Sequence, residues 1–211
     1  MANTAALDGI NGLRDIRRSP ASHLAAVLEA GSIQGSVVLN EIPFQTMAGV
    51  RVDPRSEEGF RIAAVVGGLP TRSGEVGGAD GVSVLWLGPS EFLVVAPEEA
   101  HDSLGGDLIS SLTGALSHAP GQVVDLSANR TTFELSGPRA RAVLEKGCAL
   151  DLHPRSFPPG TALTTEVGSI PVTLQKTGAE SFRLFPRASF ADYLGRWLLD
   201  ALREFASPEV P

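Results

Sequence analysis

The chain of 211 residues contains a single cysteine, Cys148. One cysteine excludes a disulfide within the chain, redox chemistry on a cysteine pair, and a zinc site built from several thiolates of this chain alone. The four histidines, His23, His101, His118 and His153, are scattered, and no His-x-x-x-His pair is present. Because a metal site needs several such ligands close together, we expect no metal to be held by this chain.

Basic residues are also scarce. The chain has 17 lysines and arginines against 24 acidic residues, a formal net charge of -7 and a pI near 5.1. Nucleic acids and anionic membranes attract clustered basic side chains, so we expect neither as a partner. No uninterrupted apolar run is long enough to cross a bilayer, and residues 1–8 lack the basic region and apolar core of an export signal. We therefore expect a cytoplasmic protein.

Motifs for nucleotide binding and nucleophilic catalysis are missing as well. The glycines between residues 67 and 81 do not follow the Gly-x-Gly-x-x-Gly order, and they predict a surface loop that forms the main flexible insertion. No Gly-x-Ser-x-Gly sequence is present, and Cys148 lies on the apolar side of its predicted helix, which favours buried packing over reactivity. The residues themselves predict no catalytic, cofactor-binding or metal-binding site.

What is present is enough apolar sequence, 43% of the residues, to bury the core of one domain. A helix is predicted from Ser19 to Gly31, because serine and proline favour a first helical turn and glycine favours the exit. Apolar and β-branched runs predict strands at residues 36–42, 49–52 and 61–66. The glycine-rich loop follows the last of them.

One arrangement of elements occurs twice. A hairpin at residues 82–87 and 91–96 leads into a helix opened by Pro97, in which leucines recur at 104, 108, 112 and 116. About ninety residues later, a hairpin at 172–174 and 181–185 leads into a helix opened by Pro186. Ser189 and Asp192 form a predicted capping box there. The apolar face of this second helix contains Phe190, Leu194, Trp197, Leu198, Ala201, Leu202 and Phe205.

The repeat predicts the fold class. Strands at 122–126 and 131–135 and a helix after Pro138 lie between the two hairpin-helix units. Because strands and helices do not alternate regularly, we expect an α+β domain with a mostly antiparallel sheet and helices packed on it, and no doubly wound parallel sheet. We expect a flexible arm at 1–18, one domain at 19–206 with repeat halves at about 34–121 and 122–206, and a tail at 207–211.

Asp125 and Arg130 flank the polar centre of the segment between two predicted strands. An acid beside a base can hold a ligand or form an ion pair, and we interpret the two residues as bracing a turn. Trp86 and Trp197 lie among apolar neighbours, which favours core packing over ligand stacking. Residues 151–154 and 158–160 form a rigid polar connection, interpreted as a linker, with a docking surface as the alternative.

Between residues 82 and 205 the chain resembles the gamma subunit family of heterotetrameric sarcosine oxidase. The segments that carry this resemblance are Leu85-Trp86-Leu87-Gly88-Pro89, Asp125-Leu126-Ser127-x-Asn129-Arg130, Leu135-Ser136-Gly137-Pro138-x-Ala140-Arg141, Lys146-Gly147-Cys148-x-Leu150-Asp151-Leu152 and Phe190-Ala191-Asp192-Tyr193-Leu194. The family is similar in turn to the folate-binding domain of glycine-cleavage T-protein. That similarity implies two repeated, swapped β-α-β units.

The resemblance also implies a function. Such an oxidase demethylates sarcosine to glycine and yields hydrogen peroxide with formaldehyde or 5,10-methylenetetrahydrofolate. The family places FAD, FMN, NAD, zinc and tetrahydrofolate in partner subunits, so none would be bound by this chain. The chain would be a non-catalytic structural subunit whose partners are the alpha, beta and delta subunits.

Three alternatives stay open. The first is a free-standing folate-binding-domain protein of one-carbon or iron–sulfur/tRNA-maturation metabolism, to which Lys146-Gly147-Cys148 bears a local likeness. The signature of that family continues with Tyr-x-Gly-Gln-Glu, whereas Ala149-Leu150-Asp151 follows here. The second is a folate-dependent aminomethyl transferase, which needs a carboxylate in a folate cavity. The third is a binding module of unassigned function.

Overall fold

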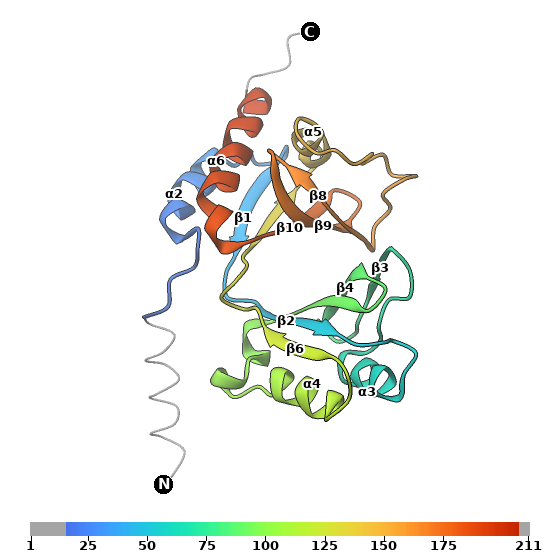
Figure 1. Ribbon diagram of the computed structural model, residues 1–211. Coiled ribbons are helices and arrows are strands. Elements are labelled where there is room, and N and C mark those ends of the chain that lie inside the picture. Colours follow the sequence, from blue (N-terminus) through green and yellow to red (C-terminus); the bar gives the residue numbers. More distant parts are fainter. Residues whose placement is uncertain (1–15, 207–211) are drawn as a thin grey trace.

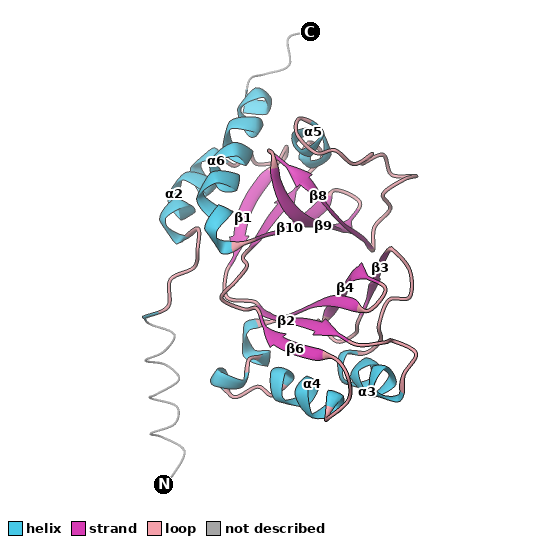
Figure 2. Ribbon diagram, in the orientation of Figure 1, coloured by secondary structure: helices cyan, strands magenta, loops and turns pink. Residues whose placement is uncertain are grey.

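The computed structural model describes residues 16–206. Most of the expected arm, and the whole expected tail at 207–211, lie outside the described residues. The described chain forms one continuous antiparallel sheet of ten strands, which folds into two layers that face each other, here called the first and the second sheet. Helices cover the outer surfaces of both, as Figure 1 and Figure 2 show. This arrangement confirms the predicted α+β class and the predicted antiparallel pairing.

Each sheet has five strands. The first sheet contains, in spatial order, β1 (Val38–Ile42), β7 (Thr132–Ser136), β10 (Ser181–Pro186), β9 (Ile170–Gly178) and β8 (Thr161–Val167). The second contains β3 (Gly74–Gly77), β4 (Ser83–Gly88), β5 (Glu91–Ala96), β2 (Thr46–Arg51) and β6 (Gln122–Asp125). The first sheet is covered by α2 (Ala25–Gly31), α5 (Ala140–Glu145) and α6 (Ala191–Leu202), and the second by α3 (Glu57–Val66) and α4 (Leu108–Leu116).

The hydrophobic core has three parts because both faces of each sheet are covered. One part lies between the first sheet and its helices, and another between the second sheet and α3 and α4. The third lies between the two sheets and consists of Met47, Leu85, Leu93, Val95, Ala162 and Phe185. Burial on both faces explains why β5 is a continuous apolar run and does not alternate.

The two sheets exchange one strand each. β1 and β2 are consecutive in the chain, but β1 belongs to the first sheet and β2 to the second. In the same way, β6 belongs to the second sheet and β7, which follows it, to the first. The chain passes between the sheets at residues 43–45, here named the first crossing, and at residues 126–131, the second crossing. The Thr132 hydroxyl donates to the Gln45 side-chain oxygen at 2.6 Å, so the crossings lie together. The exchange matches the swapped units that the resemblance implied.

The repeat predicted from the sequence is present. The orders β2-α3-β3-β4-β5-α4 and β7-α5-β8-β9-β10-α6 are the same, and each copy is preceded by the strand that it lends to the other sheet. Both predicted hairpins form, as β4–β5 and β9–β10. The division of the chain into 34–121 and 122–206 as separate halves stays a prediction.

Residues 61–66 are helical, so the strand predicted there was wrong. They belong to α3, which begins where the Ser56 hydroxyl accepts the Gly59 N–H at 3.0 Å and ends at Gly67 with φ +82°. Ile62 and Val66 are both buried, at the spacing of one helical face. The β-branched side chains suggested a strand, and the cap together with packing on the second sheet outweighs that preference.

The glycine-rich segment is more than the surface loop that was predicted. It contains β3, which pairs with β4 on one side and with β8 on the other and so joins the two sheets. Glu75 orders the turn before β3, because its carboxylate accepts the backbone N–H groups of Thr71 and Arg72 at 2.9 and 3.0 Å. The Thr71 N–H and the Arg72 guanidinium lower the pKa of Glu75 from 4.5 to about 2.

The lowered pKa of Glu75 predicts that this turn opens in acid. A carboxyl with a depressed pKa in the folded state stabilises the fold above its unfolded pKa and loses that contribution as pH falls toward its folded pKa. We therefore expect amide exchange at residues 71–77 to accelerate as pH falls from 4.5 to about 2, after correction for intrinsic rates. In Glu75→Gln the turn should exchange faster at neutral pH and lose this acid-dependent step. Equal pH profiles for the two chains would contradict the prediction.

Two helices begin differently in the structure from what the sequence predicted. The helix expected from Pro97 is divided into η2 (Glu98–Ala100), η3 (Asp102–Leu104) and α4, because Gly105 turns the chain at φ +92°. The capping box of the last helix is not formed. A 3-10 turn, η4 (Ala188–Phe190), occupies the preceding turn, and Asp192 instead contacts His23 at 2.7 Å and Arg196 at 3.0 Å.

The first helix also starts differently. η1 (Ser22–Leu24) precedes α2, and the Ser19 hydroxyl donates to Glu41 and does not cap the helix. The predicted apolar face of α6 is confirmed: Leu194, Leu198, Ala201 and Leu202 are buried, and the aromatic residues of that face pack against the same core.

Candidate functional site

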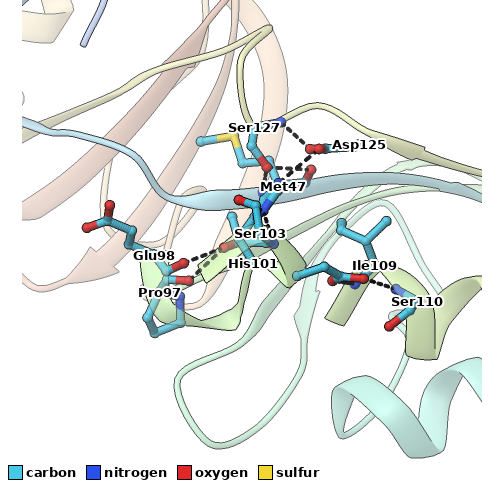
Figure 3. Close-up of polar contacts among 11 residues, drawn as sticks. Met47, Pro97, Glu98, His101, Ser103, Ile109, Ser110, Asp125 and Ser127 are labelled. Carbon is cyan, nitrogen blue, oxygen red and sulfur yellow. Dashed lines mark hydrogen bonds and ion pairs between the residues drawn. The ribbon is translucent and has the colours of Figure 1, made fainter. Parts of the chain in front are cut away.

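The segment that links β6 to β7 fastens the two crossings to each other. Asp125 accepts the Ser127 N–H at 2.9 Å, which closes a tight turn at the end of β6. The Ser127 hydroxyl then accepts the Met47 N–H at 3.0 Å, and the Leu126 N–H donates to the Met47 carbonyl at 2.8 Å. Figure 3 shows the contacts among Met47, Asp125 and Ser127. The Asp-Leu-Ser sequence thus secures the start of β2 to the end of β6.

His101 joins this turn from a distant part of the sequence. Its Nε2 lies 2.9 Å from Asp125 Oδ2, and its Nδ1 accepts the Ser103 N–H at 3.1 Å, with the Ser103 hydroxyl oxygen 2.8 Å away. Because Nδ1 accepts a backbone N–H, the proton of the neutral ring is assigned to Nε2. The three side chains follow the order Asp-His-Ser in space (Figure 3). No sequence spacing had linked His101 to Asp125.

Acidic side chains in this region are held as anions. Burial opposes ionisation of Asp125, but hydrogen bonds from Ser127 and His101 outweigh that cost and lower the pKa of its carboxyl. Burial also opposes ionisation of Asp102, whose pKa is lowered by the N–H groups of Ile109 and Ser110, each 2.9 Å away. These two donors belong to the first turn of α4, so Asp102 satisfies the N-terminus of that helix.

The polar cluster borders a cavity of about 410 Å³ beside the two crossings. Its wall includes His101, Ser103, Asp125 and Ser127, the second-crossing residues Ala128 and Arg130, and Phe44 of the first crossing. The N-terminal segment closes another side with Arg17, Arg18 and Pro20. The volume lies within the range of small-molecule sites, which is roughly 300–1,000 Å³.

Asp125 and Arg130 do not pair with each other. Arg130 Nη1 donates to the Phe185 carbonyl at 2.8 Å, and the buried Nε has no hydrogen-bond partner among the described residues. Burial lowers the pKa of Arg130, and the nearby charge of Arg187 lowers it further. Asp125 therefore braces the turn of the second crossing, and Arg130 fastens that crossing to the end of β10.

The other sequence candidates lie apart from this cavity. Cys148 packs against the core of the first sheet and its main chain bridges to Val167. Trp86 and Trp197 also pack against core clusters. Within residues 16–206 no group of three or more His, Cys, Asp or Glu side chains is placed to hold a metal ion, and no described helix combines the length and apolarity needed to span a membrane.

Comparison with known proteins decides the family. Residues 63–204 match the model of the sarcosine oxidase, gamma subunit family. The sarcosine oxidase subunit gamma of an Arthrobacter species is 51% identical over 197 residues, covering 92% of this chain and 94% of that protein. The chain belongs to the sarcosine oxidase gamma subunit family. The gamma subunit of Corynebacterium sp. strain U-96 is 47% identical over 214 residues and matches over the full length of both chains.

Solved structures agree with this assignment. A chain of heterotetrameric sarcosine oxidase from Corynebacterium sp. U-96, solved in complex with pyrrole 2-carboxylate, superposes with a TM-score of 0.87 at 48% identity, covering 93% of this chain and 100% of that chain. Aminomethyltransferase T of the glycine cleavage system from Bartonella henselae gives a TM-score of 0.65 at 14% identity, over 87% of this gamma subunit and 57% of that chain. The second likeness shows the shared fold alone. The gamma-subunit resemblance inferred from the motifs is confirmed.

Proposed function

We propose that this gamma subunit is an architectural, non-catalytic member of the sarcosine oxidase assembly. In this proposal the alpha, beta and delta subunits carry the chemistry, with FAD, FMN, NAD, zinc and tetrahydrofolate bound outside this chain. The gamma subunit contributes a rigid surface against which the larger subunits assemble. The cytoplasmic location expected from the sequence stays a prediction.

The single observation that carries the proposal is that both ring nitrogens of His101, in the Asp125–His101–Ser103 group, are already engaged in structural contacts. A general base needs a ring nitrogen with a free lone pair, and a nucleophilic hydroxyl needs that nitrogen as its acceptor. Here Nδ1 of His101 already accepts the Ser103 N–H at the start of η3, and Nε2 faces Asp125. Both oxygens of Asp125 are also engaged. The group is built as a brace between the η3 turn and the second crossing.

The match to the heterotetrameric oxidase supports the role in assembly. The solved chain is covered from end to end by this gamma subunit, so the architecture found there has its counterpart here. A permanent complex of this kind buries more than about 2,000 Å² in total. An interface of that size is held by buried surface, so the architectural role requires no chemistry from the cavity residues.

Co-expression with and without the gamma chain tests the proposal. With all four subunits present, we expect one complex with sarcosine-dependent oxygen consumption and flavin absorbance. Without gamma, the yield of assembled complex should fall, and gamma purified alone should show no flavin absorbance and no turnover. Recovery of gamma as a stable monomer that binds folate tightly would instead favour a free-standing folate-binding protein. Sarcosine-dependent oxygen consumption by gamma alone would contradict the non-catalytic role.

Cys148 offers a further test of that role. Its thiol packs against the core of the first sheet, so Cys148→Ser places a hydroxyl in apolar surroundings and should cost about 1–2 kcal/mol of unfolding free energy. Oxygen consumption per bound flavin should stay unchanged in the assembled enzyme. Cys148→Ala is the matched control, since it removes the thiol without adding a hydroxyl. Loss of turnover in both variants with normal assembly would assign the thiol to the chemistry.

A further inference from the structure

Arg130 is an incompletely satisfied cation in the wall of the 410 Å³ cavity. Its Nη1 is used by the Phe185 carbonyl, its buried Nε has no partner, and no carboxylate forms an ion pair with it among the described residues. A partly buried guanidinium that pairs with no carboxylate is costly, because burial removes water and a single carbonyl oxygen replaces only part of it. The lowered pKa of Arg130, caused by burial and by Arg187, reflects that cost.

The other charges around the cavity do not compensate Arg130. Asp125 is held by Ser127 and His101, and Arg17 is paired with Glu98 at 2.7 Å. Arg18 is exposed and makes no ion pair within residues 16–206. The cavity therefore has two uncompensated cations, Arg18 and Arg130, although the whole chain carries a net charge of -7. A local excess of positive charge in an acidic protein attracts anions to that place.

Phe44 adds an apolar wall in an unfavourable backbone conformation. Its φ is +57°, which costs a residue with a side chain roughly 1–2 kcal/mol. Its ring lies 4.2 Å from the Arg17 guanidinium carbon and lines the same cavity. Backbone strain of this kind is retained where the surrounding structure needs the side chain in one position. A cavity lined by both an aromatic ring and arginines suits a ligand with an apolar body and an anionic head.

We propose that this cavity binds a small organic anion, with its carboxylate or phosphate on Arg130 and Arg18 and its apolar body against Phe44 and Pro20. The Nη2 group of Arg130, which donates to no described residue, supplies the hydrogen bond to the anion. The cavity is several times larger than one carboxylate group, which favours a free small molecule over an acidic side chain from a neighbouring subunit. The ligand would stabilise the crossings, so the site is compatible with the architectural role and does not depend on it.

The test measures anion binding by the assembled oxidase. Calorimetric titrations with benzoate and with phenyl phosphate are compared for complexes that contain wild-type gamma, Arg130→Gln or Arg18→Gln. The other subunits are identical in all preparations, so any difference belongs to gamma. The wild-type complex should bind one more equivalent of the probe anion per gamma chain than the Arg130→Gln complex. Arg18→Gln should lower the affinity for that additional anion about tenfold, as expected for loss of one charged contact. Arg55→Gln, which changes an exposed arginine outside the cavity wall, is the control.

The two probes distinguish the anionic heads, since whichever binds more tightly identifies the preferred chemistry. Equal stoichiometry in wild-type and Arg130→Gln complexes overturns the proposal. So does a folded Arg130→Gln chain that no longer joins the assembly, because the anion would then be a side chain of a neighbouring subunit. If the Arg130 variant does not fold, Arg18→Gln decides: weakened binding supports the site, and unchanged affinity overturns it.

Discussion

Replacing Gly137 with alanine is expected to lower the free energy of unfolding by about 3 kcal/mol or more, the sum of backbone strain and steric overlap. Gly137 has a φ of +115°, which side-chain-bearing residues rarely adopt. An added Cβ would overlap the Ser36 carbonyl oxygen and lie 3.0 Å from its carbonyl carbon. The obstacle is backbone, so it cannot move aside as a flexible side chain would.

The position of Gly137 makes the loss cooperative. Gly137 follows β7, and Ser36 precedes β1, the strand that β7 receives through the exchange. Pushing these segments apart disturbs the β1–β7 pairing as well as the local turn. Gly35→Ala is the matched control, since Gly35 has φ +78° and no atom within 4 Å of an added Cβ. It should cost only about 1–2 kcal/mol. Urea unfolding monitored by tryptophan fluorescence measures both, and equal losses would contradict the steric argument.

Trp197→Ala is expected to cost about 3 kcal/mol, at the lower end of such substitutions because the ring is only partly buried. The ring lies against two glycines that leave no room for side chains: an added Cβ at Gly147 would be 2.5 Å from Cζ2, and one at Gly168 would be 2.8 Å from Cδ2. Gly168 also donates to the Gly147 carbonyl at 3.1 Å. Trp197 therefore covers the point where the end of α5 meets the β8–β9 turn.

Loss of the Trp197 ring should loosen this junction without changing the chemistry of the oxidase. Thermal unfolding of the purified chain, followed by far-ultraviolet circular dichroism, would report the loss. Arg196→Ala is the control on the same helix, because Arg196 is exposed and, among residues 16–206, pairs only with the exposed Asp192. It should change stability by less than about 1 kcal/mol. A similar effect of the two substitutions would argue against packing by Trp197.

The parts of the fold that could be predicted from the sequence are those with strong local patterns. The two hairpins were found because β-favouring runs flank short turns, and the face of α6 because its apolar residues recur with the helical period. The repeat followed from comparing these patterns. Residues 61–66 were misjudged because a six-residue run containing three β-branched side chains carries too little pattern to reveal a helix that depends on its cap and its packing.

The candidate site could be predicted only in part. Asp125 was expected to brace a turn, since a strand was predicted on each side of its segment, and it does so by accepting the Ser127 N–H. Its contact with His101 spans 24 residues and exists because the η2–η3 segment lies against the second crossing. The role of β3 was likewise hidden, because glycines that suggest a loop are used there in a strand that joins two sheets.

By itself, then, the sequence determined the repeat, the class of the fold and the family, because these depend on local pattern and residue content. Tertiary structure alone decided that β3 joins the two sheets, that Asp125 faces His101, and that Arg130 lines a cavity without pairing with a carboxylate of the described residues. These features arise where segments distant in the sequence meet. The free energy of such contacts comes from packing and desolvation across the whole domain, which no short stretch of residues encodes.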